Sequence, residues 1–176
     1  MTTAMKKQLS IAAFYGFRSG NGGISHVMLN LMNALAAKNI QVDLLLNETQ
    51  IPEIVNLHRN IRVVKLGRAS GLMRIPLLVR YLKKTRPVVL LASREPANRV
   101  AIVSRYLSNV NTRIVVRVGM AISIALNRRS PIKRWLRQSA IKFCYRRNDA
   151  IIANARGVAE DISLITQIPL APCSCG

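Results

Sequence analysis

Short runs of apolar residues alternate along the chain with segments in which apolar residues recur every three to four positions. Six of the runs are rich in Ile, Leu and Val and end near Gly, Pro or polar residues, a pattern typical of buried β-strands. We expect strands at residues 9–15, 42–46, 61–66, 88–93, 112–118 and 149–153. The periodic segments between them predict helices at residues 24–38, 72–84, 97–108, 132–147 and 156–167.

The order of these elements predicts the fold class. Strands that are apolar on both faces and are joined by helices form parallel sheets with helices on both sides. The predicted fold is therefore α/β, a Rossmann-like doubly wound parallel sheet. The sequence has no internal repeat and no low-complexity linker, so we expect one domain at residues 1–169 and an irregular tail at residues 170–176.

Composition adds a large and uneven positive charge. The chain has 176 residues, 50% of them hydrophobic, and 27 Lys and Arg against 7 Asp and Glu give a net charge of +20. Between residues 61 and 148, Glu95 is the single acid. This excess implies an anionic partner, which could be a membrane surface, nucleic acid or a phosphate-bearing substrate. The sequence lacks basic patches interleaved with aromatic residues, so no nucleic acid partner is expected.

A glycine-rich turn, Gly20-Asn21-Gly22-Gly23, separates the first predicted strand from the first predicted helix. Glycine lets backbone amides approach a phosphate, and a helix N-terminus adds partial positive charge. Gly22 and Gly23 are therefore candidates for binding a diphosphate, although a plain tight turn explains the same residues. The spacing matches neither G-x-G-x-x-G nor a P-loop, which disfavours a dinucleotide site and a Walker ATPase.

Polar residues follow the fourth and fifth predicted strands. Ligands of open parallel sheets bind at the carboxyl ends of the strands. Five residues at these ends are candidates for a substrate-binding cleft: Arg94, Glu95, Asn98, Arg117 and Gly119. The alternative is structural, with an ion pair and a helix start around residues 94–98 and an ordinary turn at Gly119.

The predicted helix near residues 128–147 is strongly basic and contains no acid. One face of this helix carries Ile132, Trp135, Leu136, Ser139 and Phe143 and is largely apolar. This pattern is typical of a helix that lies on anionic lipid, and five basic residues are expected to face the membrane: Arg128, Arg129, Lys133, Arg134 and Arg137. We expect the apolar stripe to dock on the sheet while the basic face meets lipid headgroups. The alternative is a sheet-covering helix whose basic face is only solvated.

Several other site classes are not expected. No stretch has the length and apolarity of a transmembrane helix, and the N-terminus lacks the apolar core of a secretory signal, so we expect a cytoplasmic location. His26 and His58 have no partner at metal-ligand spacing, and Cys173 with Cys175 supplies too few thiolates for a closed zinc site. Cys144 is expected to be a buried core thiol.

Several stretches, in their order and spacing, resemble the N-terminal domain of a family 4 glycosyltransferase, an enzyme of the GT-B fold. They are residues 21–24, 35–45, 86–91 with Asn98, 112–119 and 145–161. In the last stretch Asn154-Ala155 stands where the family usually has a Ser nearby. The resemblance covers roughly residues 8–169.

The resemblance implies a retaining transfer of a sugar from a nucleotide-sugar to a lipid-linked or lipopolysaccharide-type acceptor, without a cofactor. This domain would hold the acceptor at the five candidate residues, and Gly22 and Gly23 would border the donor diphosphate. The basic helix would rest on the inner face of the plasma membrane.

The sequence departs from the family in two ways. It contains no Glu-x7-Glu, the motif with which the family's second domain binds the nucleotide-sugar. The resemblance therefore implies a chain truncated before the donor domain, or paired with a separate donor-domain chain, and inactive alone. Many members also carry a His near the position of Gly119, where this sequence has none.

Functions of two other classes stay open. A non-catalytic basic α/β module that binds an anionic membrane or nucleic acid fits the same charge. A nucleotide-dependent oxidoreductase fits the fold class, but the missing dinucleotide fingerprint disfavours it.

Overall fold

A computed structural model describes residues 9–15, 23–46, 57–127 and 130–169. In these residues six parallel strands form one sheet in the order β3-β2-β1-β4-β5-β6. The strands are β1 (Ser10–Tyr15), β2 (Gln41–Leu46), β3 (Ile61–Lys65), β4 (Val89–Ser93), β5 (Arg113–Val118) and β6 (Ala150–Ala153). All six predicted strands are confirmed. The central strands β1, β2, β4 and β5 are largely buried, as strands covered on both faces should be, whereas the edge strands β3 and β6 are partly exposed.

The helices connect these strands. They are α1 (Gly23–Ala37), α2 (Arg74–Thr85), α3 (Glu95–Ser108), α4 (Ile122–Asn127), α5 (Pro131–Tyr145) and α6 (Arg156–Thr166), with a short 3-10 turn, η1 (Gly71–Met73), before α2. The five predicted helices are present, whereas α4 was not predicted. Helix α3 begins two residues earlier than expected, since Pro96 is tolerated in a first turn, where its missing N–H is not needed.

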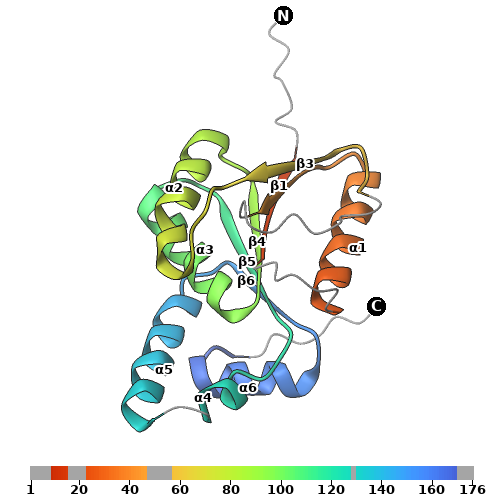
Figure 1. The fold of residues 1–176 in the computed structure, drawn as a ribbon. Helices are drawn as coiled ribbons and strands as arrows, with labels where there is room; N and C mark the ends of the chain where they lie inside the picture. Colours follow the sequence, from red (N-terminus) through yellow and green to blue (C-terminus); the bar gives the residue numbers. More distant parts are fainter. Residues whose placement is uncertain (1–8, 16–22, 47–56, 128–129, 170–176) are drawn as a thin grey trace, which may run out of the picture.

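Helices cover both faces of the sheet (Figure 1). On one face α1 packs through Met28, Met32 and Ala36 against apolar residues of β1, β2 and β4. The opposite face carries the larger core, to which α2, α3, α5 and α6 contribute. This arrangement confirms the Rossmann-like doubly wound fold. The strand order reverses between β1 and β4, and folds of this kind bind ligands beyond the carboxyl ends of the strands at that point.

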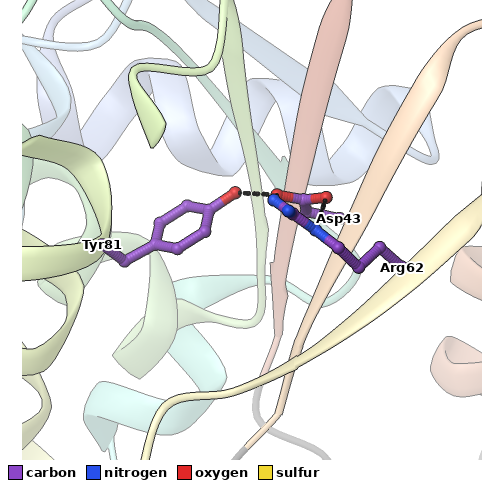
Figure 2. Close-up of polar contacts among 3 residues, drawn as sticks. All are labelled: Asp43, Arg62 and Tyr81. Carbon is purple, nitrogen blue, oxygen red and sulfur yellow. Dashed lines mark hydrogen bonds and ion pairs between the residues drawn. The ribbon is translucent and has the colours of Figure 1, made fainter. Parts of the chain in front are cut away.

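A polar cluster around the buried carboxylate of Asp43 joins β2, β3 and α2 near one edge of the sheet (Figure 2). Asp43 of β2 is only 4% exposed and accepts hydrogen bonds from Arg62 of β3, at 2.9 Å from Nε and 2.6 Å from Nη2. The hydroxyl of Tyr81 in α2 donates to Oδ2 of Asp43 at 2.6 Å. Burial, followed by the hydrogen bond to Asp43, raises the pKa of Tyr81, so the phenol stays protonated and donates. The cluster therefore fixes strand β3 and helix α2 to β2.

Candidate functional site

The predicted site residues lie at the carboxyl edge of the sheet. Gly23 is the first residue of α1, Arg94 lies between β4 and α3, and Gly119 directly follows β5. Gly22 lies outside the described residues. This edge therefore brings together residues that are far apart in the sequence, at the place where the topology predicts a ligand.

Arg94 has an unusual backbone conformation. Its φ of 77° and ψ of 135° lie in a region that residues other than glycine rarely adopt. The backbone N–H of Asn98 donates to the carbonyl of Arg94 at 2.9 Å, which helps to hold the turn. Conformations of this kind cost on the order of 1–3 kcal/mol and cluster at ligand-binding sites. The strained turn thus lies at the point where the strand order reverses.

Glu95 forms the ion pairs that the sequence left as an alternative to substrate binding. Its Oε1 lies 2.6 Å from Nε of Arg99, one helical turn along α3. Its Oε2 accepts a hydrogen bond from Nη2 of Arg137 in α5 at 2.6 Å. The Glu95 side chain is 13% exposed, and two guanidinium groups balance its charge. Glu95 therefore joins the start of α3 to α5, and its role in acceptor binding stays a prediction.

Asn98 is fully buried and supports the edge from the α3 side. Its Nδ2 donates to the backbone carbonyl of Arg117 at 3.2 Å and to the hydroxyl of Tyr145 at 3.0 Å. Burial raises the pKa of Tyr145, so this phenol also stays neutral. The amide of Asn98 thus holds the end of β5 and is not exposed at the surface.

Arg117 turns its side chain to the other face of the sheet. Its neighbours Val116 and Val118 belong to the larger core, and side chains alternate along a strand, so the guanidinium lies on the α1 side. Arg117 is only 9% exposed, and its Nη1 is buried without a hydrogen-bond partner among the residues that the structure describes.

Gly119 lies beside this guanidinium. A Cβ atom on Gly119 would lie 3.4 Å from Nη1 of Arg117, and 4.0 Å both from Nδ2 of Asn154 and from Cδ1 of Ile24. The ends of β5 and β6 and the start of α1 therefore meet at one point. Asn154 was not among the predicted site residues.

The orientation of α5 differs from the prediction. The apolar stripe does not dock on the sheet, because four of its side chains are largely exposed: Ile132 by 75%, Trp135 by 66%, Leu136 by 57% and Phe143 by 61%. The buried face of α5 instead consists of Ile141, Cys144 and Tyr145. These residues also follow a helical period, so α5 has two apolar faces. The face with Trp135 and Phe143 was predicted to dock on the sheet, and this prediction is wrong. The prediction that Cys144 is a core thiol is confirmed, and burial raises the pKa of this thiol.

The basic residues predicted to face a membrane divide into three groups. Lys133 and Arg134 are exposed, as expected. Arg137 is not on this surface, because its side chain is 20% exposed and turns inward to Glu95. Arg128 and Arg129 lie outside the described residues.

The described ranges hold no group of three or more His, Cys, Asp or Glu side chains that could hold a metal ion. Within the same part of the chain, no helix has the length and apolarity needed to span a bilayer.

Two acidic residues with clear roles escaped the sequence analysis. Asp43 is the one charge inside an otherwise apolar strand, and such a residue signals a buried partner. Asp161 accepts from the backbone N–H groups of Ile122 and Ser123, at 2.6 and 3.2 Å, and so caps α4 from a distant helix. Nothing local to α4 could have indicated this cap.

Solved structures with a similar fold include a galactosyltransferase and a sucrose-phosphate synthase. The lipopolysaccharide outer core galactosyltransferase WaaB has a TM-score of 0.61 at 17% identity, over 89% of this chain and 42% of the other. Sucrose-phosphate synthase from Thermosynechococcus elongatus has 0.65 at 17%, over 88% and 44%. MurG from Acinetobacter baumannii has 0.52 at 12%, over 82% and 40%. The chain thus spans less than half the length of each of these GT-B proteins.

The comparison with curated proteins finds no match. A family model, the glycosyl transferase 4-like domain, matches residues 22–170. This range includes the start of α1, the carboxyl edge of the sheet and the whole of α5 and α6. Since the match covers well over half of the sequence, the chain belongs to the family of glycosyl transferase 4-like domains.

Proposed function

We propose that the chain is the acceptor-binding domain of a glycosyltransferase that moves a sugar from a nucleotide-sugar, with retention of configuration, to a lipid-linked or lipopolysaccharide-type acceptor. The family match over residues 22–170 is the observation that carries this proposal. The acceptor class is supported by a similar fold that is named a lipopolysaccharide outer core galactosyltransferase. In this proposal Gly22 and Gly23 border the donor diphosphate, and Arg94 and Gly119 lie on the acceptor side.

Transfer needs a donor-binding part that this sequence lacks. It contains no Glu-x7-Glu, and it spans less than half the length of the solved structures that share its fold. Positioning donor and acceptor in one site supplies much of the rate, and the leaving diphosphate must be neutralised. The proposal therefore includes a donor domain, on a separate chain or further along the same one, and no turnover by the 176 residues alone.

The exposed face of α5 supports the proposal that the protein binds its acceptor at a membrane. Trp135, Leu136 and Phe143 face outward together with Lys133 and Arg134. The guanidinium of Arg147 stacks over the ring of Phe143, 3.5 Å from its centroid. Large apolar side chains interleaved with Lys and Arg match the boundary between lipid tails and anionic headgroups. A purely solvated sheet-covering helix would have buried its aromatic residues, so the structure favours the membrane alternative for this helix.

We therefore place the protein on the inner face of the plasma membrane as a peripheral protein. Each Lys or Arg close to an anionic surface contributes about 1 kcal/mol of binding free energy. Insertion of the apolar side chains adds to this attraction and makes it less dependent on salt. This combination distinguishes lipid from nucleic acid, for which exposed Leu and Ile side chains offer no advantage.

Vesicle binding tests the membrane part. Trp135 is the only tryptophan of the chain, so its fluorescence reports directly on α5. With phosphatidylglycerol vesicles we expect a blue shift of the Trp135 emission and co-sedimentation of the chain. The double substitution Lys133→Glu and Arg134→Glu should weaken binding at least about tenfold, given about 1 kcal/mol per cation.

The matched control changes the same charge elsewhere. Lys83→Glu with Lys84→Glu alters two exposed lysines near the end of α2, which carries no comparable aromatic face. If both double variants bind vesicles equally well, or lose binding equally, α5 is not the membrane-binding face.

Acceptor binding and turnover test the enzymatic part. Lipid-linked glycans embedded in the vesicles should raise the affinity of the chain above that for lipid alone, whereas nucleotide-sugars should yield no nucleotide release. If the affinity for vesicles is the same with and without the glycan, the non-catalytic membrane module is favoured. Nucleotide release that disappears in Gly23→Val would show that the chain contains a complete active site and that the acceptor-domain proposal is wrong.

A further inference from the structure

The side chain of Arg117 poses a physical problem that the fold itself does not solve. Charged side chains are almost never fully buried unless they are paired, because removing a charge from water is costly. Arg117 is 9% exposed, and its Nη1 has no hydrogen-bond partner in the part of the chain that the structure describes. The other buried charges there have partners: Asp43 binds Arg62 and Tyr81.

A second side-chain donor lies near this guanidinium. Nη1 of Arg117 lies 3.4 Å, and Nδ2 of Asn154 4.0 Å, from the position of a Cβ on Gly119. No carboxylate of the described residues forms an ion pair with Arg117. Glu95, an acid at the same edge of the sheet, is paired with Arg99 and Arg137.

A side chain from the first turn of α1 lies near the same point. Cδ1 of Ile24, the second residue of α1, is also 4.0 Å from that Cβ position. The first four N–H groups of a helix have no partners within the helix, and the helix dipole makes this end attractive to anions. Two polar groups thus lie beside Gly119 near the start of α1: the guanidinium of Arg117, whose Nη1 has no partner among the described residues, and the side-chain amide of Asn154.

We propose that Arg117 and Asn154, beside the start of α1, form a binding subsite for a phosphate group of a substrate, with Gly119 kept as glycine to leave room for it. The inference rests on the proposed function and deepens it, because it assigns to this domain a charged residue of its own for substrate phosphate. The phosphate belongs either to the nucleoside diphosphate of the donor or to a phosphorylated acceptor, and both present the same oxygens to the guanidinium.

Calorimetric titration of the 176-residue chain with small phosphates tests the subsite without requiring turnover or lipid. The probes are inorganic pyrophosphate, UDP and glucose 6-phosphate, at about 0.15 M salt, where exposed charges are screened beyond about 8 Å. We expect saturable binding that Arg117→Gln weakens by at least about tenfold, as befits a hydrogen bond to a charged group. Tighter binding of UDP would identify the donor as the source, and tighter binding of glucose 6-phosphate the acceptor.

The strongly basic chain demands a control for diffuse attraction. Arg113→Gln removes the same charge from the start of the same strand, where the residue is exposed, and should leave the affinity unchanged. Equal weakening by both variants, or no saturable binding of any probe, overturns the proposal.

If Arg117→Gln folds poorly, Gly119→Ala provides a second test of the subsite. Its φ is not in the left-handed region, so alanine fits the backbone, but the methyl group would lie 3.4 Å from Nη1 of Arg117 and take up the space for a ligand oxygen. We expect a folded variant with at least about tenfold weaker binding, again the effect of one charged hydrogen bond. Unchanged affinity in Gly119→Ala contradicts the subsite even if vesicle binding through α5 is intact, so the two proposals fail separately.

Discussion

Asp43 and Arg117 are both charged residues buried within the sheet, and they differ in what surrounds them. Asp43 lies in β2 and accepts three hydrogen bonds from Arg62 and Tyr81. Arg117 lies near the end of β5, and its Nη1 is unpartnered among the described residues. The first arrangement is complete without any ligand and the second is not. The difference teaches that a buried charge marks a binding site only when the fold itself leaves it uncompensated.

The largest effect should come from removing the compensated charge. Asp43→Ala leaves the hydroxyl of Tyr81 buried without its acceptor and removes the contact of Arg62 in β3 with β2, so we expect the free energy of unfolding to fall by about 3 kcal/mol. Urea denaturation measures it. Glu160→Ala is the control, since it removes one acid and one ion pair from an exposed position on α6 and should change stability by less than about 1 kcal/mol. If Asp43→Ala lowers the free energy of unfolding no more than Glu160→Ala does, the contrast drawn between Asp43 and Arg117 is wrong.

An intermediate effect is expected at Glu95. Glu95→Gln keeps the shape of the side chain but removes the charge that Arg99 and Arg137 share. Because this side chain is 13% exposed and its pairs are charge-assisted, unfolding should become easier by about 1–2 kcal/mol. Thermal unfolding at several salt concentrations measures the loss, with Glu160→Gln as the control. Unchanged stability together with lost acceptor binding would show that Glu95 serves the substrate and not the joint between α3 and α5.

The smallest effect on stability should occur at Arg117, although this residue is nearly as buried as Asp43. Without a phosphate ligand, Arg117→Met removes a charge that lacks a partner, and replacement of a buried charge by an apolar side chain is often neutral or stabilising. We expect a change between zero and a gain of about 1 kcal/mol, measured by urea denaturation in phosphate-free buffer. Saturating pyrophosphate should then stabilise the original chain and not the variant. A loss comparable to that of Asp43→Ala would mean that Arg117 is a structural residue.

The alternation of strands and helices could be predicted because it is encoded locally. Mostly apolar runs such as residues 42–46 and 112–118, each interrupted by at least one charged residue, fit strands that are covered on both faces, and the structure places strands there. The carboxyl edge of the sheet followed from the same order, since parallel strands all end on one side. The predicted residues of the edge therefore came from topology and not from recognition of a site.

The roles of individual residues at this edge could not be predicted in the same way. Arg137 was assigned to the outer face of α5, yet it lies inside because Glu95, 42 positions away, attracts it. The short helix α4 was missed because its N-terminal amides bind Asp161, which is 39 positions away. In both cases the deciding partner is distant in sequence and no local pattern reports it.

By itself, the sequence determined the α/β class, the strand positions and the strong positive charge, since each depends on the identity of neighbouring residues or on simple summation. Tertiary structure alone decided which face of α5 is buried, because that helix has two apolar faces and only docking distinguishes them. It also decided that Asp43 has its partners and that Nη1 of Arg117 lacks one. Compensation of a charge requires a second group within about 4 Å, and that proximity is a property of the folded chain.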